Sequence, residues 1–142
     1  MKQKLINQLK RILRKENLKF TPQRLAILEE LLSSEEHREC EDIYYALKQS
    51  GVNISRATVY RTMDLLCNYN FARKLELGDG KARYENKKKS DHHDHLICIQ
   101  CGKIDEFVDI TIENQQEKVC KSKGFTLVRH IHQLFGNCKD CQ

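Results

Sequence analysis

Apolar residues recur every three or four positions along the first half of the chain, a spacing typical of helices with one buried face. The pattern predicts four helices, over residues 2–16, from Thr21-Pro22 to about Leu32, over 40–48, and over 56–68. Thr21 and Ser55 stand where N-caps are needed, and Pro22 is favoured in a first helical turn. Gly51 ends the third helix.

After the fourth helix, apolar and polar residues suit a strand over 71–77 and a second strand over 81–85, joined by the turn Gly78-Asp79-Gly80. Several helices followed along the chain by a β-hairpin are typical of a winged helix-turn-helix fold. A polar stretch then predicts a linker over 87–91. Beyond it we expect short strands at 96–98 and 104–107, a helix over 110–123 between Asp109 and Gly124, and a final strand over 125–135.

The predicted fold class is therefore α+β. A winged-helix domain would span residues 1–86, and a second, small α/β domain would span residues 92–142. Apolar residues make up 39% of the 142 positions, so each domain can build only a small core. A metal ion or a dimer interface would then supply part of the stability.

Charge is unevenly distributed between these two parts. Residues 1–90 hold 19 Lys and Arg against 12 Asp and Glu, whereas residues 91–142 hold 6 against 8 and five of the six histidines. A basic first part is expected for a protein that binds a polyanion such as nucleic acid, although a solvated basic surface would look the same.

The cysteines and the absence of long apolar segments indicate the compartment. Residues 1–18 lack the apolar run of a signal peptide, and no stretch of 18 apolar residues exists, so we expect a cytoplasmic protein without a membrane partner. Thiols stay reduced there, so seven cysteines indicate metal or redox chemistry rather than disulfides. Cys40, Cys67 and Cys120 have no partner at ligand spacing and are predicted to be buried small residues.

The third and fourth helices form a candidate helix-turn-helix, whose second helix would enter the major groove of DNA. An arginine can donate to guanine edges or phosphates, and a tyrosine can offer its hydroxyl and ring. The candidate DNA-binding residues are Lys15, Lys19, Arg56, Thr58, Tyr60 and Arg61, with Lys74, Lys81 and Arg83 of the hairpin as further backbone contacts. The alternative is an ordinary small helical bundle with a solvated basic face.

Two CxxC pairs, Cys98-x-x-Cys101 and Cys138-x-x-Cys141, provide four thiolates from two tight turns. Four thiolates complete a closed tetrahedral site that favours structural Zn²⁺. Metal-free reduced pairs or a redox couple are the alternatives.

Directly before the first pair stands His92-His93-Asp94-His95. On a strand, alternate side chains point to opposite faces, so His93 and His95 would serve one site while His92 and Asp94 serve another. Nitrogen and oxygen ligands suit Fe²⁺, Zn²⁺ or Mn²⁺, and a plain surface histidine patch is the alternative.

Six segments, taken in order, resemble the ferric-uptake-regulator (Fur) family. They are Thr21-Pro22-Gln23-Arg24, Glu41-Asp42-Ile43-Tyr44, Ala57-Thr58-Val59-Tyr60-Arg61, Gly78-Asp79-Gly80-Lys81, Arg83-Tyr84-Glu85, and the run from His92 to Lys103 that contains the first CxxC pair. The resemblance extends from about residue 18 to Cys141. It implies a homodimeric, metal-dependent DNA-binding repressor with a winged helix and an α/β dimerisation domain.

The resemblance also implies ligand sets that spacing alone does not provide. Structural zinc would be held by Cys98, Cys101, Cys138 and Cys141. A regulatory metal would be held by His37, Glu85, His93, His95 and Glu106, and an additional metal by His92, Asp94, Glu113 and His130. One departure is Asn68-Tyr69-Asn70, which stands where a glycine often follows the fourth helix; asparagine tolerates the same left-handed backbone.

We expect Fe²⁺ as the regulatory metal and iron-uptake genes as targets, with a peroxide-sensing or zinc-uptake regulator as the alternative. Peroxide sensors of the family commonly carry Asp where this chain has Glu85 and Glu106, and zinc sensors often have a Cys ligand near Glu85. A zinc hydrolase would need an open metal position and a general base, and the chain has no HExxH motif. We therefore predict no enzymatic activity and no small-molecule substrate; a zinc-stabilised protein-interaction module is the other rival.

Overall fold

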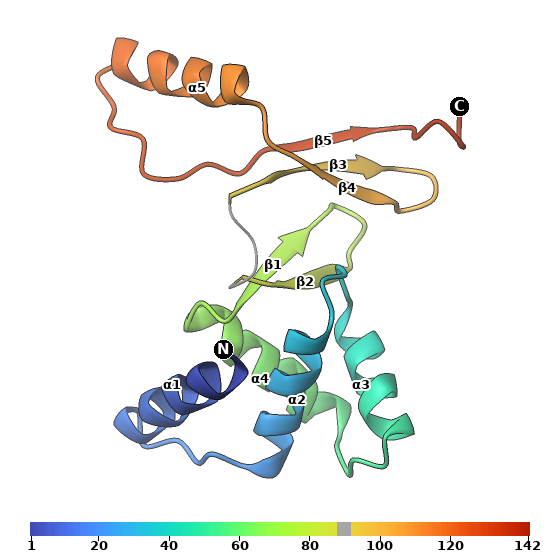
Figure 1. The fold of residues 1–142 in the computed structure, drawn as a ribbon. Coiled ribbons are helices and arrows are strands. Elements are labelled where there is room, and N and C mark those ends of the chain that lie inside the picture. Colours follow the sequence, from blue (N-terminus) through green and yellow to red (C-terminus); the bar gives the residue numbers. More distant parts are fainter. Residues whose placement is uncertain (88–91) are drawn as a thin grey trace. The chain divides into compact units, whose positions relative to one another are not determined.

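The computed structural model describes residues 1–87 and 92–142, and the chain divides into two compact units, Met1–Ser90 and Asp91–Gln142 (Figure 1). The division falls within the predicted linker 87–91, of which residues 88–91 lie outside the described part of the chain. Within the described residues, no helix has both the length and the apolar character needed to cross a bilayer.

The N-terminal unit begins with four helices around one apolar core: α1 (Lys2–Lys15), α2 (Pro22–Ser33), α3 (Cys40–Gln49) and α4 (Arg56–Asn68). The core side chains without solvent exposure include Leu9, Leu13, Ile27, Leu28, Ile43, Val59, Met63, Leu66 and Phe71. The hydroxyl of Thr21 accepts a hydrogen bond from the backbone N–H of Arg24, and that of Ser55 accepts one from Thr58, both at 3.2 Å. Both predicted N-caps are therefore confirmed.

The wing is an antiparallel hairpin of β1 (Ala72–Glu76) and β2 (Ala82–Asn86), with Lys74 opposite Tyr84 (Figure 1). It follows α4 through Asn70, whose φ of +62° is the left-handed conformation expected for this turn. The hairpin lies at one end of the helical bundle, as the winged-helix prediction requires.

A short segment before α3 also lies beside β2. The backbone N–H of Arg38 donates to the carbonyl of Tyr84 at 3.0 Å, and the N–H of Tyr84 donates back to Arg38 at 2.7 Å. Glu39 then caps α3, because its backbone N–H donates to the Asp42 carboxylate at 2.8 Å. The wing is thus tied directly to the start of the helix-turn-helix.

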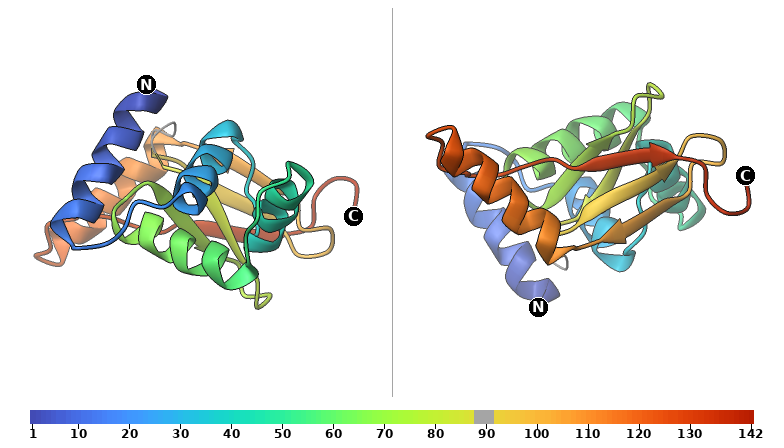
Figure 2. Two further views of the ribbon diagram at one scale, coloured as in Figure 1. Left: turned by 90° about the horizontal axis from the view of Figure 1, so that it is seen from below. Right: turned by 90° about the horizontal axis from the view of Figure 1, so that it is seen from above.

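The C-terminal unit has a three-stranded sheet with one helix. β3 (Asp94–Cys98) is the central strand, flanked by antiparallel β4 (Ile104–Phe107) and parallel β5 (Gln133–Gly136), and α5 (Ile110–Ser122) leaves from the end of β4 (Figure 2). Asp109 caps α5 by accepting hydrogen bonds from two backbone N–H groups. The predicted final strand over 125–135 is wrong in its first part, because only the segment that starts at Gln133 pairs with the five-residue β3.

The C-terminal unit buries few apolar side chains. Its buried residues are Ile97 and Cys98 together with the polar His93, Asp94 and His95, and α5 has no buried residue. Large apolar side chains remain exposed on this unit: Leu96, Ile99, Val108, Ile110, Val119, Phe125, Val128, Ile131, Leu134 and Phe135. Within its described residues, this unit has no apolar core comparable to that of the N-terminal unit.

The core of the N-terminal unit predicts a clear difference between two leucines near the end of α1. We expect Leu13→Ala to lower the free energy of unfolding by about 2–5 kcal/mol, because Leu13 is fully buried and its truncation leaves a cavity. Leu18→Ala, at a residue 39% exposed, should change it by about 0.5 kcal/mol. Urea denaturation followed by circular dichroism measures both, and equal losses would contradict the described core.

Candidate metal centres and DNA-binding surface

Four cysteines of the C-terminal unit converge on one point. The Sγ atoms of Cys98, Cys101, Cys138 and Cys141 all lie within 4.8 Å of one another, and we call them the four-thiol cluster. Tight turns place the pairs: the N–H of Gly102 donates to the carbonyl of Cys98 at 3.0 Å, and that of Cys141 donates to Cys138 at 2.9 Å. All seven cysteines of the chain are free thiols, so no disulfide competes for these sulfurs.

The cluster has the dimensions of a tetrahedral zinc site. With Zn–S bonds of about 2.3 Å, two thiolates on one ion lie about 3.8 Å apart. The Sγ atoms of Cys101 and Cys138 are 3.8 Å apart. The donor set and this spacing fit Zn²⁺, and four protein ligands leave no open position for a substrate.

The thiols of this cluster differ in how readily they ionise. Backbone N–H groups of Cys101 and Cys138 donate to the Cys98 sulfur and lower the pKa of Cys98 to about 6. Hydrogen bonds with the thiols of Cys138 and Cys101 raise the pKa of Cys141 to about 12. One thiolate therefore forms easily, whereas four adjacent thiolates need a cation to offset their repulsion.

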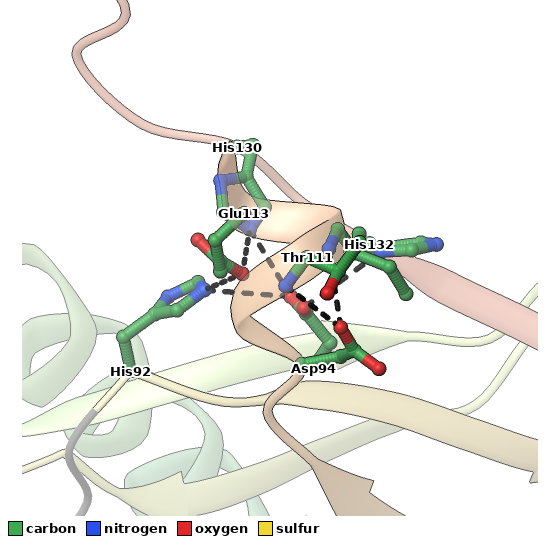
Figure 3. Close-up of polar contacts among 8 residues, drawn as sticks. His92, Asp94, Thr111, Glu113, His130 and His132 are labelled. Atoms are coloured by element: carbon green, nitrogen blue, oxygen red, sulfur yellow. Dashed lines mark hydrogen bonds and ion pairs between the residues drawn. The ribbon is translucent and has the colours of Figure 1, made fainter. Parts of the chain in front are cut away.

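A second group combines two histidines with two carboxylates. Four side chains point toward one another: His92 just before β3, Asp94 at its start, Glu113 in the first turn of α5 and His130 in the segment before β5 (Figure 3). We call them the His–carboxylate cluster. The Nε2 atom of His92 lies 3.2 Å from Glu113, and that of His130 lies 3.2 Å from Asp94. Two nitrogens and two carboxylate oxygens at this spacing fit a divalent transition metal.

His132 belongs to the surroundings of this cluster, although the sequence reading did not single it out. Its Nδ1 atom lies 3.7 Å from Oδ2 of Asp94, a carboxylate that is only 2% exposed (Figure 3). Ligating carboxylates are commonly held by such neighbours. The sequence contains a clue to this contact: His130 and His132 are two positions apart in a segment predicted to be a strand, so their side chains would point to the same side.

The N-terminal unit contributes one histidine–carboxylate pair. The Nε2 atom of His37 lies 3.0 Å from Oε2 of Glu85, and the other oxygen of Glu85 lies 3.4 Å from Arg73. The β-bridge between Arg38 and Tyr84 brings the pair together, because His37 directly precedes Arg38 and Glu85 directly follows Tyr84. Residues 48 positions apart in the sequence are thereby brought together.

The C-terminal unit contributes a separate group, formed by His93 just before β3, His95 on β3 and Glu106 on β4. The Nε2 atom of His93 lies 3.4 Å from Glu106, the rings of His93 and His95 are 4.8 Å apart, and His95 is opposite Glu106 in the β3–β4 register. The strand alternation thus separates this group from the His–carboxylate cluster, as the sequence pattern predicted.

The proposed DNA face carries cations without partners in the described part of the chain. Lys15, Lys19 and Arg61 are exposed, and no hydrogen bond or ion pair of their side chains is found there. Tyr60 is 47% exposed on α4. Lys19, Arg24 and Arg61 line a hollow of about 740 Å³. Helices α2 and α4 both begin at this hollow, because their N-caps Thr21 and Ser55 also line it. Backbone N–H groups at helix N-termini and cations both attract phosphate.

Other candidates for DNA contact are engaged within the protein. Arg56 pairs with Glu41, and the hydroxyl of Thr58 lies 2.9 Å from that of Ser55. On the wing, Arg83 pairs with Asp79 at 2.9 Å, Lys81 lies 3.9 Å from Glu39, and Lys74 lies 3.3 Å from Glu76. The pairs of Arg56 with Glu41 and of Lys81 with Glu39 join separate segments of the chain, whereas Lys74 and Glu76 lie on the same strand.

Comparison with known proteins identifies the family. The model of the ferric uptake regulator family matches residues 15–135. The ferric uptake regulation protein of Campylobacter jejuni is 42% identical over 139 residues, which cover 96% of this chain and 88% of that protein. The chain belongs to the ferric uptake regulator family.

Solved structures of the family share this fold. The Helicobacter pylori ferric uptake regulator, described with three functional metal binding sites, matches with a TM-score of 0.93 and 36% identity over 100% of this chain and 94% of that chain. The Francisella tularensis ferric uptake regulator with iron matches with a TM-score of 0.81 and 30% identity over 87% of this chain and 94% of that chain. The fold class and the family inferred from the sequence motifs are confirmed.

The four-thiol cluster predicts which cysteine is needed for zinc. We expect Cys101→Ser to lower the zinc content by about one ion per chain, because three thiolates no longer close the tetrahedron. Cys67→Ser is the control, since Cys67 is half-buried in α4 outside the cluster. Metal analysis after gel filtration measures the content, and a Cys101→Ser protein that retains its zinc would contradict the assignment.

The ionisation of the thiols predicts their order of alkylation. Burial raises the pKa of the Cys67 thiol to about 11, so this thiol is protonated at pH 7 and its reactivity should rise about tenfold per pH unit between 8 and 10. Cys98, with its lowered pKa, is mostly thiolate at pH 7 and should react first with iodoacetamide in metal-free protein. Peptide mass spectrometry checks the order. Added Zn²⁺ should slow the alkylation of Cys98 but not that of Cys67. Faster alkylation of Cys67 than of Cys98 in metal-free protein would contradict the described environments.

Proposed function

We propose that this chain is a homodimeric, metal-dependent DNA-binding repressor that responds to Fe²⁺ and controls iron-uptake genes. Membership of the ferric uptake regulator family supports the general class, and the relatives named above are ferric uptake regulation proteins. In this proposal the protein is a regulator in the cytoplasm, where the chromosome lies, and it has no enzymatic activity.

One observation carries the proposal: a histidine and a carboxylate, side chains of types that bind metals, meet in the winged-helix unit at the start of its helix-turn-helix. His37 and Glu85 are 3.0 Å apart, and the next residues after His37 bridge to the wing and cap α3. A metal ion bound to this pair would act directly on the elements that contact DNA.

We propose that the regulatory ion joins this pair to the histidines and the glutamate of the C-terminal unit, so that its ligands are His37, Glu85, His93, His95 and Glu106. Such an ion would restrict the winged helix to the arrangement that fits a palindromic operator. Because metal then binds the DNA-competent form better, it would shift the population toward that form. The four-thiol cluster would hold the structural Zn²⁺, and the His–carboxylate cluster an additional metal.

For DNA recognition, we propose that α4 enters the major groove. Tyr60 and Arg61 would contact base edges or phosphates there, and Thr58 would lie close to the backbone. Lys15 and Lys19 would contact phosphates or the minor groove from the end of α1. The exposure of Lys15, Lys19, Tyr60 and Arg61 and the hollow between α2 and α4 support this assignment.

The exposed apolar surface of the C-terminal unit supports the dimer. Ten large apolar side chains lie exposed on this unit, and β5 forms an edge of its sheet. An exposed edge strand and a large apolar patch both favour a protein partner. We propose a second copy of this chain as that partner, because a palindromic operator requires two winged helices.

Iron is favoured over the two alternatives by the ligand types. Glu85 and Glu106 stand where peroxide sensors of the family commonly have aspartate, and no cysteine lies near Glu85 in the sequence to make the zinc-selective set. Nitrogen and carboxylate ligands suit Fe²⁺ and Mn²⁺.

The proposal predicts that loss of one regulatory ligand weakens the metal response. We expect Glu106→Gln to raise the Fe²⁺ concentration needed for half-maximal DNA binding by about tenfold or more, because a charged ligand is lost. Glu117→Gln is the matched control, since this exposed glutamate pairs only with Lys121 among the described residues. Anaerobic fluorescence anisotropy with a duplex selected from a randomised library measures both.

Other outcomes would redirect the proposal in defined ways. DNA binding that needs only Zn²⁺ would make the protein a zinc regulator, and irreversible loss after peroxide with oxidised His37 or His93 would make it a peroxide sensor. DNA binding that does not depend on any added metal would contradict a regulatory site.

A further inference from the structure

The guanidinium of Arg56 contacts three side chains of α3 on the surface of the N-terminal unit. Its Nε atom donates to both carboxylate oxygens of Glu41, at 3.2 and 3.1 Å, and its Nη2 atom donates to the hydroxyl of Tyr45 at 3.0 Å. Its plane also lies over the ring of Tyr44, 4.5 Å from the centroid. We call these four residues the α3–α4 clamp.

The clamp connects the first turns of the two helices of the helix-turn-helix. Arg56 is the first residue of α4, directly after the N-cap Ser55, and Glu41 lies in the first turn of α3. The loop between them contains Gly51, with φ of +80°, and adds no further helix. The clamp therefore restrains the angle at which α4 leaves this loop, two residues before Thr58 and four before Tyr60.

The clamp also changes what Arg56 can offer to DNA. The carboxylate of Glu41 neutralises its charge, and Tyr44 covers one face of the guanidinium. Arg61, in contrast, is exposed without an ion pair in the described part of the chain. A neutral ion pair gains little from an approaching phosphate, whereas an unpaired arginine gains the full attraction.

We propose that Arg56 is a positioning residue, which holds the first turn of α4 against α3 and leaves the DNA contacts to Arg61 and its neighbours. This inference rests on the proposed DNA-binding function, and it replaces the sequence-based assignment of Arg56 as a DNA contact. Arginine suits this position because separate N–H groups of one planar guanidinium reach the Glu41 carboxylate and the Tyr45 hydroxyl while the group lies over the Tyr44 ring. A lysine ammonium has no planar group to lie over that ring.

Two readouts test the clamp in the full-length, metal-loaded protein. The first is hydrogen exchange of backbone N–H groups in the first turn of α4, measured without DNA. The second is affinity for a duplex selected by the wild-type protein, measured over a range of KCl concentrations. The variants are Glu41→Gln, Arg56→Gln, Arg56→Lys and the double variant of Glu41→Gln with Arg56→Gln. Asp64→Asn removes a charge from an exposed position of α4 outside the clamp and serves as the control.

The clamp predicts that each single variant speeds exchange in this turn and weakens DNA binding about two- to fivefold, the scale of an exposed ion pair. The double variant should be no weaker than the singles, and the slope of log affinity against log salt should not change. Asp64→Asn should bind as tightly as the wild type or more tightly. Weaker DNA binding by Glu41→Gln is the most decisive result, because removing a negative charge would by itself strengthen binding to DNA.

A direct phosphate contact would give the opposite pattern and would overturn the proposal. Glu41→Gln would then bind more tightly, Arg56→Gln would lower the salt slope by about 0.9, and Arg56→Lys would retain most of the affinity. If the wild-type protein selects no duplex, the proposed function fails, and hydrogen exchange still decides the clamp. Unchanged exchange in both Glu41→Gln and Arg56→Gln would overturn it.

Discussion

Side chains of metal-ligand types hold most of the few buried positions of the C-terminal unit, and the stability of this unit depends on how their charges are satisfied. Asp94 is buried with histidines on either side, and four thiols crowd within 4.8 Å. A buried unpaired charge costs several kcal/mol, so such an interior is stable only when cations offset it. Where ligands replace an apolar core, the free energy of metal binding becomes part of the free energy of folding.

The N-terminal unit follows the opposite principle. Its helices enclose a continuous apolar core, and its α3–α4 clamp and N-caps are complete within the unit. His37 and Glu85 form a histidine–carboxylate pair of this unit, next to the bridge between Arg38 and Tyr84. In the proposed regulator, a metal ion at this pair would act on a unit whose apolar core is complete without it.

Much of this organisation could be predicted from local sequence. Helical periodicity, the caps at Thr21 and Ser55, and the left-handed Asn70 each depend on a few neighbouring residues, so the helices and the wing were predicted nearly to their ends. The two CxxC pairs and the alternation from His92 to His95 likewise depend on spacing along a turn or a strand. The strand predicted over 125–135 is wrong before Gln133, because a strand exists only where a partner strand lies beside it.

The amino-acid sequence by itself therefore determined the elements, the thiol pairs and the two faces of β3, since these follow from backbone geometry over a few residues. Only the tertiary structure decided which distant side chains meet. His37 joins Glu85 through a one-residue bridge, His132 lies behind Asp94, and Arg56 turns to Glu41 on another helix. Such pairings arise from the packing of separate elements, and no periodicity in the sequence encodes the distance between them.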